Sequence, residues 1–404
     1  MRLNDMEALS LLLIEGPRII YFKYDWTSKK ATQVIYQFRD VEIGQVSTGP
    51  EFIIEGSEAP SFLLSGSDSA MFMGICIGEG LRFWRIEANM DQVHSMSYSD
   101  ALNLLYMASP DRHGFFVLES KRLKICEHQI FTSFSPYSRI LYNNQGLHKN
   151  DNGLLCMSES GQILYNLVAG NLARKKHYTD NYFRGFSFIR AIKKHSLDSI
   201  HSYLLISSNF SSLALCLEDN VLTDVSSVFN IEKEAKTLEA FNLTGTRLFV
   251  QIHSNGLNVS DLAQVETPQL SSSKFTFRVE PGAWFLAAHH QAYICCYEKQ
   301  KECLLFYEIK SRPRDAEFVS EIAKVSLIRY GLSEVTCLKF IELEETAVLA
   351  LVIADALGKV AIVRLPLNSR EPTFTSPQVA FDLQEPIEDI AALSKDGKMA
   401  VATR

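Results

Sequence analysis

The chain has 404 residues, of which 47% are hydrophobic and 22% charged, with a formal net charge of −7. This composition allows a large core, and the net negative charge argues against a protein that binds nucleic acid over its whole surface. No signal-peptide pattern is visible and no run approaches about 20 apolar residues, so we expect neither a signal peptide nor a membrane span. The eight cysteines are scattered, mostly inside apolar segments, so we expect buried thiols in an intracellular, soluble protein.

Short apolar segments separated by polar turns recur about every 40 to 50 residues, which is typical of a β-propeller. The clearest units are Phe62–Ile86, Leu104–Cys126, Leu154–Val168, Tyr203–Leu217, Leu248–Val259, Trp284–Ile309 and Val348–Leu365. Each unit has an apolar strand, a turn rich in Gly, Asn, Asp or Ser, and a second apolar strand. We therefore predict an all-β fold, a β-propeller of seven or eight irregular WD-like blades.

In chain order, Met6–Leu13 is a weak candidate helix, and Asn230–Phe241 is a second candidate because Asn230 can cap good helix formers. The apolar runs Ala283–Ala288 and Ala347–Ile353 are predicted to be inner strands of blades, because neighbouring blades cover both faces of such strands. Neither helix is long enough for a series of α/β crossovers, so a parallel-sheet enzyme fold is not expected.

Hydrophilic stretches between these strands look like inserted loops. They are 143–153, the locally basic 174–180 and 190–198, and the Ser-rich 264–274. None of them forces a domain boundary. The simplest organisation is one propeller region over 1–404, with a possible subdivision near 195–200 and parts of two propellers as the alternative.

The segment Ile387–Arg404 has the pattern of half a blade: an apolar strand, a Lys-Asp-Gly turn and a second strand. A half-blade would leave an unpaired strand edge, which invites aggregation. We expect either that the N-terminal strand completes this last sheet or that the chain is part of a larger protein.

No motif predicts a cofactor, a metal or catalysis. Gly78-Glu-Gly80 lacks the third glycine and following helix of a dinucleotide site. Cys295 and Cys296 are adjacent, so in a strand they point to opposite faces and cannot chelate one ion with Cys303, His289 and His290. No Gly-x-Ser-x-Gly elbow exists. Propeller glycosidases place carboxylates on inner strands, but nothing in this sequence selects such a pair.

The best local binding signal is a basic stretch with interleaved aromatic residues. Phosphate contacts plus stacking on a single-stranded nucleic acid would suit such a patch, while a solvated loop that balances an acidic body is the competing interpretation. The candidate residues are Arg174, Lys175, Lys176, Tyr182, Arg184, Arg190, Lys193 and Lys194.

The segment Val319–Leu367 resembles a propeller segment of a known family. It contains Glu334-Val335, then Cys337-Leu338, then an apolar strand that ends Val363-Arg364-Leu365. The family includes the large subunits of the damaged-DNA-binding protein and of the cleavage and polyadenylation specificity factor, together with a splicing-factor subunit. Tyr203–Ser260 resembles the same propeller. The likeness is closest to the N-terminal domain of the family's methyl-methanesulfonate-sensitivity adaptors, and this chain resembles a partial member.

The resemblance implies a nuclear, non-catalytic scaffold that binds protein subunits of a larger complex. Such scaffolds are adaptors of cullin–RING ubiquitin ligases, including those of DNA repair, or platforms for mRNA 3′-end processing and splicing. Nucleic acid is a possible further partner, directly or indirectly; no membrane and no cofactor are expected. The alternatives are an unrelated intracellular propeller that binds proteins and, less favoured, a glycosidase-like propeller enzyme.

Overall fold

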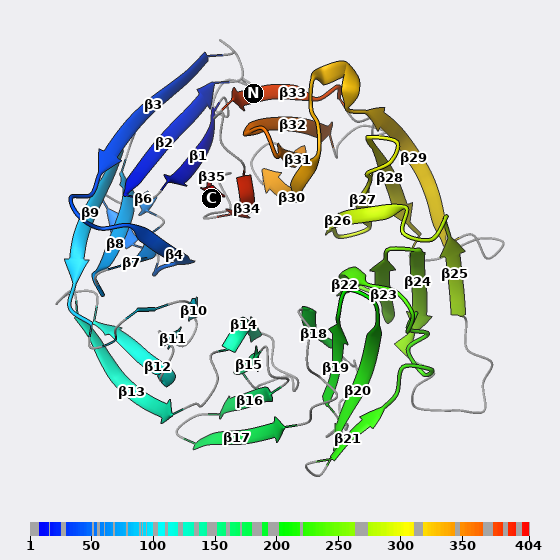
Figure 1. Cartoon of the computed structure of the whole chain (residues 1–404), viewed down its shortest axis with the longest axis horizontal. Coiled ribbons are helices and arrows are strands. Elements are labelled where there is room, and N and C mark those ends of the chain that lie inside the picture. The colour runs from blue at the N-terminus through cyan, green and yellow to red at the C-terminus, as the bar shows by residue number, and fades with distance from the viewer. Residues whose placement is uncertain are drawn as a thin grey trace. The chain divides into compact units, whose positions relative to one another are not determined.

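The computed structural model describes most of the chain. The described residues are 8–15, 17–25, 30–50, 52–54, 57–59, 61–67, 69–77, 80–88, 90, 92–93, 95–99, 104–109, 112–119, 124–132, 137–143, 152–158, 162–169, 172–179, 188–192, 202–218, 221–262, 274–310, 318–343, 348–366, 375–382, 387–392 and 398–403. Apart from short 3₁₀ turns such as η4 (Ile328–Tyr330), their regular structure is β-strand (Figure 1). No helix in these ranges is long and apolar enough to cross a membrane.

Sequential antiparallel strands form four-stranded sheets, the blades of a β-propeller. In chain order, the first four of these four-stranded sheets consist of β4 (Ile43–Thr48), β7 (Ser61–Gly66), β8 (Met71–Ile77) and β9 (Gly80–Ile86); of β10 (Ser95–Ser99), β11 (Leu104–Ala108), β12 (Arg112–Glu119) and β13 (Lys124–Thr132); of β14 (Tyr137–Asn143), β15 (Asn152–Ser158), β16 (Gln162–Ala169) and β17 (Leu172–Thr179); and of β18 (Phe188–Ile192), β19 (Ser202–Ser207), β20 (Ser212–Glu218) and β21 (Val221–Asp224). A two-stranded hairpin, β5 (Phe52–Ile54) and β6 (Ser57–Ala59), is inserted between β4 and β7.

Three more four-stranded sheets follow, and a five-stranded sheet joins the two ends of the chain. The sheets are β22 (Thr237–Asn242), β23 (Leu248–His253), β24 (Gly256–Asp261) and β25 (Lys274–Arg278); β26 (Trp284–His290), β27 (Tyr293–Glu298), β28 (Cys303–Ile309) and β29 (Val319–Ser326); β30 (Val335–Leu343), β31 (Val348–Asp355), β32 (Lys359–Pro366) and β33 (Gln378–Asp382); and, in the order β3-β2-β1-β35-β34, β34 (Ile387–Ala392), β35 (Lys398–Thr403), β1 (Ala8–Glu15), β2 (Arg18–Asp25) and β3 (Lys30–Gln37). The described strands thus form eight blades, which agrees with the prediction of an all-β propeller.

The half-blade predicted at the C-terminus is completed by the N-terminal strand. β1 pairs with β35 in parallel, with Leu12 opposite Ala400, while β34 and β35 are antiparallel (Figure 1). This pairing confirms the first of the two expectations, because it covers the edge that a half-blade would leave open.

The chain divides into two compact units. The first consists of Met1–Thr132, Lys301–Leu305 and Ala323–Arg404, and the second of Ser133–Gln300 and Phe306–Ile322. The subdivision expected near residues 195–200 stays a prediction.

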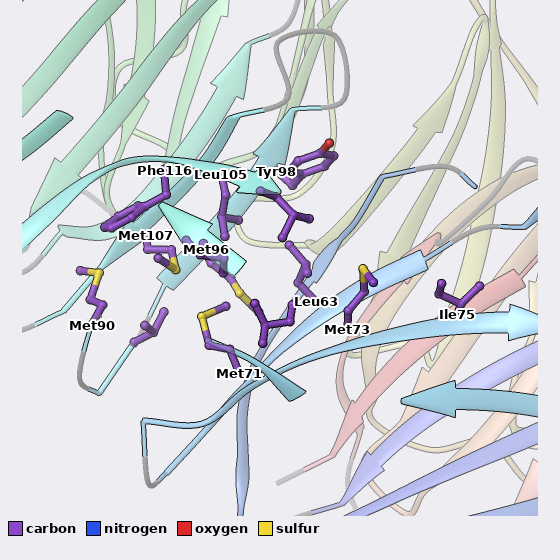
Figure 2. Close-up of a cluster of buried hydrophobic side chains, with 14 residues drawn as sticks. Leu63, Met71, Met73, Ile75, Met90, Met96, Tyr98, Leu105, Met107 and Phe116 are labelled. Carbon is purple, nitrogen blue, oxygen red and sulfur yellow. The ribbon is translucent and has the colours of Figure 1, made fainter. Parts of the chain in front are cut away.

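The core of the first unit is rich in methionine. Met71, Met73, Met90, Met96 and Met107 pack with Leu63, Leu105 and Phe116 in one buried cluster that joins β7 and β8 to β10, β11 and β12 (Figure 2). Unbranched thioether side chains adapt to irregular gaps, and the twisted faces of neighbouring blades leave such gaps. The apolar repeat of the sequence is therefore the interior of the propeller.

Both helix predictions are wrong. Ala8–Glu15 is strand β1, and the segment predicted as a helix from Asn230 forms turns as far as residue 236 and then strand β22. A three-turn helix is marginal by itself, whereas β22 pairs along its length with β23 and buries Ala240 and Phe241. Tertiary pairing therefore overrides the local helix propensity.

Two of the predicted inserted loops are partly strand. Residues 174–179 belong to β17 and 190–192 to β18. No other described strand lies beyond β17 in its sheet, and polar residues are tolerated in such an outer strand. Residues 144–151 and 263–273, which cover most of the other two loops, lie outside the described residues.

The two apolar runs predicted as doubly covered strands differ from one another. In β31 the residues Leu349–Ala354 are completely buried, as expected. In β26 the prediction is wrong, since Phe285 is 46% exposed. β26 is the first strand of its sheet and therefore an edge, whereas β31 is flanked by β30 and β32.

Candidate interaction face

In each unit, the turn between the second and third strands of a blade lies beside the segment that enters a first strand. We call these turns and segments the turn face of the unit. In the second unit, Ser212 N donates to Lys233 O at 3.0 Å, and Trp284 N donates to Ser254 O at 3.2 Å. In the first unit, Ala356 N donates to Glu334 O at 3.0 Å. These backbone hydrogen bonds tie each turn to the segment beside it and fix the backbone from which the exposed side chains project.

Phe210 is the most exposed large apolar residue described, at 85%, and it lies in the turn between β19 and β20. Four serines surround it in the sequence Ser207-Ser208-Asn209-Phe210-Ser211-Ser212. The Ser208 hydroxyl oxygen accepts hydrogen bonds from the backbone N–H groups of Phe210 at 3.2 Å and Ser211 at 3.0 Å. Such local bonds from serine are typical of tight turns and fix the backbone that presents the phenyl ring.

A buried polar network anchors this turn from below. Ser207, Ser212, Thr237 and Gln251 are all buried. Thr237 N donates to Ser207 Oγ at 2.9 Å, and Gln251 Nε2 donates to Thr237 Oγ1 at 2.8 Å. Gln251 Oε1 in turn accepts from Glu232 N at 2.9 Å. Because the bonds of Thr237 with Ser207 and Gln251 are buried, the network resists local opening and gives the Phe210 turn a rigid base.

The turn face of the first unit has two exposed aliphatic residues. Ile328 of η4 is 63% exposed, and Leu357 of the turn between β31 and β32 is 56% exposed. Lys359 Nζ donates to Gly331 O at 2.6 Å, which ties the turn to the segment that contains η4. The buried Asp355 carboxylate accepts from the backbone N–H groups of Leu357 at 3.0 Å and Lys359 at 2.8 Å through Oδ1, and from Ser333 at 3.2 Å through Oδ2.

The first strands of two adjacent blades in the second unit hold a carboxylate beside an imidazole. Glu239 of β22 and His289 of β26 approach to 3.8 Å between Oε2 and Nδ1, and His289 stacks on Phe241 at 3.8 Å between ring centroids. Glycoside hydrolysis by the usual route needs two carboxylates about 5 to 10 Å apart. This contact supplies one carboxylate, and it joins two neighbouring first strands.

The cysteines of the predicted cluster lie in the core. Cys295 and Cys296 of β27 and Cys303 of β28 are buried. Complete burial raises the pKa of the Cys296 thiol, which disfavours the thiolate that reacts or binds a metal. Among the residues that the structure describes, no group of three His, Cys, Asp or Glu side chains could hold a metal ion.

The basic patch is divided between strands and residues outside the described ranges. Arg174, Lys175 and Lys176 belong to β17, and Arg190 belongs to β18. Tyr182, Arg184, Lys193 and Lys194 lie outside the described residues. The patch as a binding site therefore stays a prediction.

Sequence reasoning missed the exposed apolar residues of the turn faces. One signal was present, because a phenylalanine between two pairs of serines is out of place in a solvated turn. No comparable signal marks Ile328 or Leu357, whose exposure depends on where η4 and the β31–β32 turn lie.

The family model "RSE1/DDB1/CPSF1 second beta-propeller" matches residues 181–391, more than half of the chain. The chain belongs to this family. The match includes both segments whose sequences resemble it, Tyr203–Ser260 and Val319–Leu367, and it includes Phe210, Ile328 and Leu357. Propellers of this family type bind protein partners, which makes the chain a protein-interaction scaffold in general terms. The likeness to the N-terminal domain of an adaptor stays a prediction.

Solved structures with the same fold include WD40 propellers. The C-terminal WD40 domain of Sif2 is 12% identical, with a TM-score of 0.56, over 90% of this chain and 95% of that domain. Sqt1 from Chaetomium thermophilum is 9% identical, with a TM-score of 0.49, over 89% and 95%. The SCAP WD40 domain from fission yeast is 9% identical, with a TM-score of 0.49, over 88% and 92%. At 12% identity, the likeness to the Sif2 domain shows the propeller fold alone. No curated protein sequence matches the chain.

Proposed function

We propose that this protein is a non-catalytic scaffold of a nuclear multisubunit complex and that it binds protein subunits through its turn faces. The observation that carries the proposal is the family match over 181–391, because the exposed apolar residues of both turn faces lie inside it. Loops on a rigid scaffold are where propellers bind their partners.

The chemistry of the turn faces suits protein partners. Burying a phenylalanine or leucine side chain contributes roughly 1.5 to 3 kcal/mol, and residues that are already fixed lose little conformational entropy on binding. Phe210 meets both conditions, since it is 85% exposed and its turn is held by the Ser208 bonds. Ile328 and Leu357 offer the same kind of contact in the other unit.

Two complexes fit a scaffold of this family. One is a cullin–RING ubiquitin ligase, in which the protein would act as an adaptor. The other is the machinery of mRNA 3′-end processing or splicing. The subunits that copurify with the protein distinguish the two, and the basic stretch around Lys175 slightly favours a complex associated with nucleic acid.

The test is affinity purification of the tagged full chain from its own cells, followed by mass spectrometry. Cullin and substrate-receptor subunits would support the adaptor function, and polyadenylation or splicing subunits would support RNA processing. Recovery of the chain alone would overturn the scaffold proposal in both forms.

Matched variants link any captured subunits to the turn faces. Phe210→Ser and the double variant Ile328→Ser, Leu357→Ser should each reduce recovery at least about tenfold if these residues are hot spots. Val379→Ser is the control, because Val379 is also an exposed apolar residue, at 43%, but lies in the outer strand β33. Equal recovery with all variants would place the binding surface elsewhere.

Nucleic-acid binding has a test of its own. Replacement of Lys175, Lys176, Lys193 and Lys194 by glutamate should abolish any salt-sensitive RNA or DNA binding, because phosphate contacts release counterions. Binding that is unchanged in this variant would remove the basic patch from the proposal while leaving the protein-binding function intact.

A further inference from the structure

The five-stranded sheet has an outer strand that the seven described four-stranded sheets lack. β3 pairs with β2 on one side, and no described strand pairs with its other side. β2 occupies the fourth position in this sheet, which is the outermost position in the other blades. β3 is therefore an addition to the blade pattern and carries a strand edge of its own.

The hydrogen-bonding phase of β3 identifies which of its backbone groups point outward. Phe38 N donates to Pro17 O at 2.8 Å, which makes Phe38 and Pro17 a hydrogen-bonded pair. The register continues without a bulge, with Tyr36 opposite Ile19. Hydrogen-bonded and non-bonded pairs alternate in an antiparallel ladder, so the N–H and C=O groups of Gln33, Ile35 and Gln37 point away from β2.

Past Lys30 at its first position, β3 lacks the usual protection of a strand edge against pairing. Natural edges are blunted by charged side chains, proline or bulges. Residues 31–37 read Ala-Thr-Gln-Val-Ile-Tyr-Gln and contain neither a charge nor a proline. Val34 is 42% exposed and Ile35 is 53% exposed, on opposite faces of the strand. The part of the edge from residue 31 to residue 37 is therefore neutral and partly apolar on both faces.

The other contacts of β3 hold it firmly in place. Tyr36 Oη accepts a hydrogen bond from Leu81 N of β9 at 2.7 Å, and its ring packs edge-on against Phe83 at 5.2 Å between centroids. The strand is thus fixed to the neighbouring blade, and pairing with its outer edge would cost little further ordering.

We propose that β3 is a dimerisation strand, which pairs antiparallel with β3 of a second copy of this chain about a two-fold axis at Ile35. In this register Ile35 lies opposite its own copy, and Gln33 lies opposite Gln37 of that copy. On the other face, Val34 lies opposite Tyr36. Apolar residues thus meet apolar or aromatic ones, and amides meet amides. Three outward-facing pairs would exchange about six backbone hydrogen bonds.

The absence of charge from residues 31–37 favours a second copy as the occupant. Two identical charged edges would repel one another, whereas residues 31–37 carry no charge and match themselves about Ile35. A single pair of strands makes a small interface, so the dimer should be weak and depend on concentration.

Sedimentation velocity of the full chain over about a hundredfold range of concentration tests this inference. The wild-type protein should change from monomer to dimer. Ile35→Lys should raise the dissociation constant at least about tenfold, because two like charges would face each other across the axis. Val379→Lys is the matched control, since it puts the same charge on an exposed valine of another outer strand and should leave the dimer unchanged.

Two further measurements separate loss of pairing from loss of folding. Gln33→Pro removes an outward-facing N–H but no bond to β2, so it should weaken the dimer while the thermal unfolding temperature stays close to that of the wild type. In the wild type, the amides of Gln33, Ile35 and Gln37 should gain protection from hydrogen exchange as concentration rises.

A chain that sediments as a monomer throughout would overturn the inference. A dimer that persists in both Ile35→Lys and Gln33→Pro would place the interface elsewhere. Protection of the three outward amides only after another protein is added would make a partner's strand the occupant instead. Phe210→Ser, which tests the proposed scaffold function, should not change dimerisation, so the two proposals fail separately.

Discussion

The phenol oxygen of Tyr36 accepts a hydrogen bond from the backbone N–H of Leu81 at 2.7 Å, across 45 positions of the chain. The donor lies in β9 and the acceptor in β3, so the bond joins the added fifth strand to the neighbouring blade. The two residues also belong to one apolar cluster, in which Ile19, Tyr21 and Phe62 are buried.

Tyr36→Phe should therefore lower the free energy of unfolding by about 1 kcal/mol, because it removes the acceptor and keeps the ring. Urea unfolding measures the change. Gln33→Ala, at an exposed position of the same strand, is the control and should stay within about 0.5 kcal/mol of the wild type. Equal stability of Tyr36→Phe and wild type would mean that water replaces the lost bond.

Gly74→Ala should destabilise the protein by roughly 2 kcal/mol or more, because a Cβ at this position would overlap the ring of Phe62. Gly74 in β8 lies directly opposite Phe62 in β7, and the ring fills the space that the glycine leaves. Thermal unfolding provides the measurement.

The double variant Gly74→Ala, Phe62→Leu tests the cause. A smaller side chain at 62 should make room for the methyl group added at position 74. The double variant should therefore lose less free energy of unfolding than the two single variants lose together. Strict additivity would show that the ring is not the obstacle.

Asp355→Ala should lower the free energy of unfolding by about 3 kcal/mol, since it removes the acceptor of three backbone N–H groups at a buried position. Asp355→Asn should cost less, because an amide oxygen can still accept from Leu357 and Lys359 while the contact with Ser333 is lost. Chemical denaturation ranks the variants, and an equal cost for both would argue against the hydrogen bonds as the cause.

The stability of the protein should decrease as the pH falls through the range from about 6.5 to 4 because of His253. Burial lowers the pKa of this imidazole to about 4, opposed by the nearby Asn258 side chain and assisted by the charge of Arg278. The unfolded chain takes up a proton below about pH 6.5, whereas the folded chain does so only near pH 4. The contribution at full extent is about 3 kcal/mol.

Urea unfolding of wild type and His253→Gln at pH 7 and near pH 4.5 isolates this contribution, because glutamine does not titrate. Between pH 7 and pH 4.5 the wild type should lose more free energy of unfolding than His253→Gln does. Parallel loss of stability in both would assign the acid sensitivity to other groups.

Closure of the last blade by the N-terminal strand predicts a local effect of proline substitutions. The double variant Leu12→Pro, Leu13→Pro removes two successive N–H groups. Successive N–H groups of a strand point to opposite sides, and β1 lies between β2 and β35, so one of the two must face β35. Amides of Lys398–Thr403 should then exchange faster with solvent, as followed by hydrogen exchange with mass spectrometry. Unchanged protection of β35 would show that the parallel pairing is dispensable. Proline substitutions at Val379 and Ala380 in the outer strand β33 serve as the comparison, since they should leave β35 protected.

Local sequence patterns were sufficient to predict the repeat, the predominance of strands and the strand–turn–strand pattern of the last segment. They failed for the segment from Asn230 to Phe241, where good helix formers become turns and β22 because β23 provides pairing and the core accepts Phe241. They also failed for Phe285, because nothing in an apolar run tells an edge strand from a covered one.

The amino-acid sequence by itself determined the propeller fold and the family, since alternation, turn residues and strand spacing are local properties that repeat along the chain. Only the tertiary structure decided which side chains are presented. The exposure of Phe210, Ile328 and Leu357, the pairing of β1 with β35 and the outermost place of β3 among the described strands of its sheet each depend on residues distant in the sequence. The physical reason is that a strand's edge and a turn's exposure are set by what packs beside them, and a local pattern does not specify that neighbour.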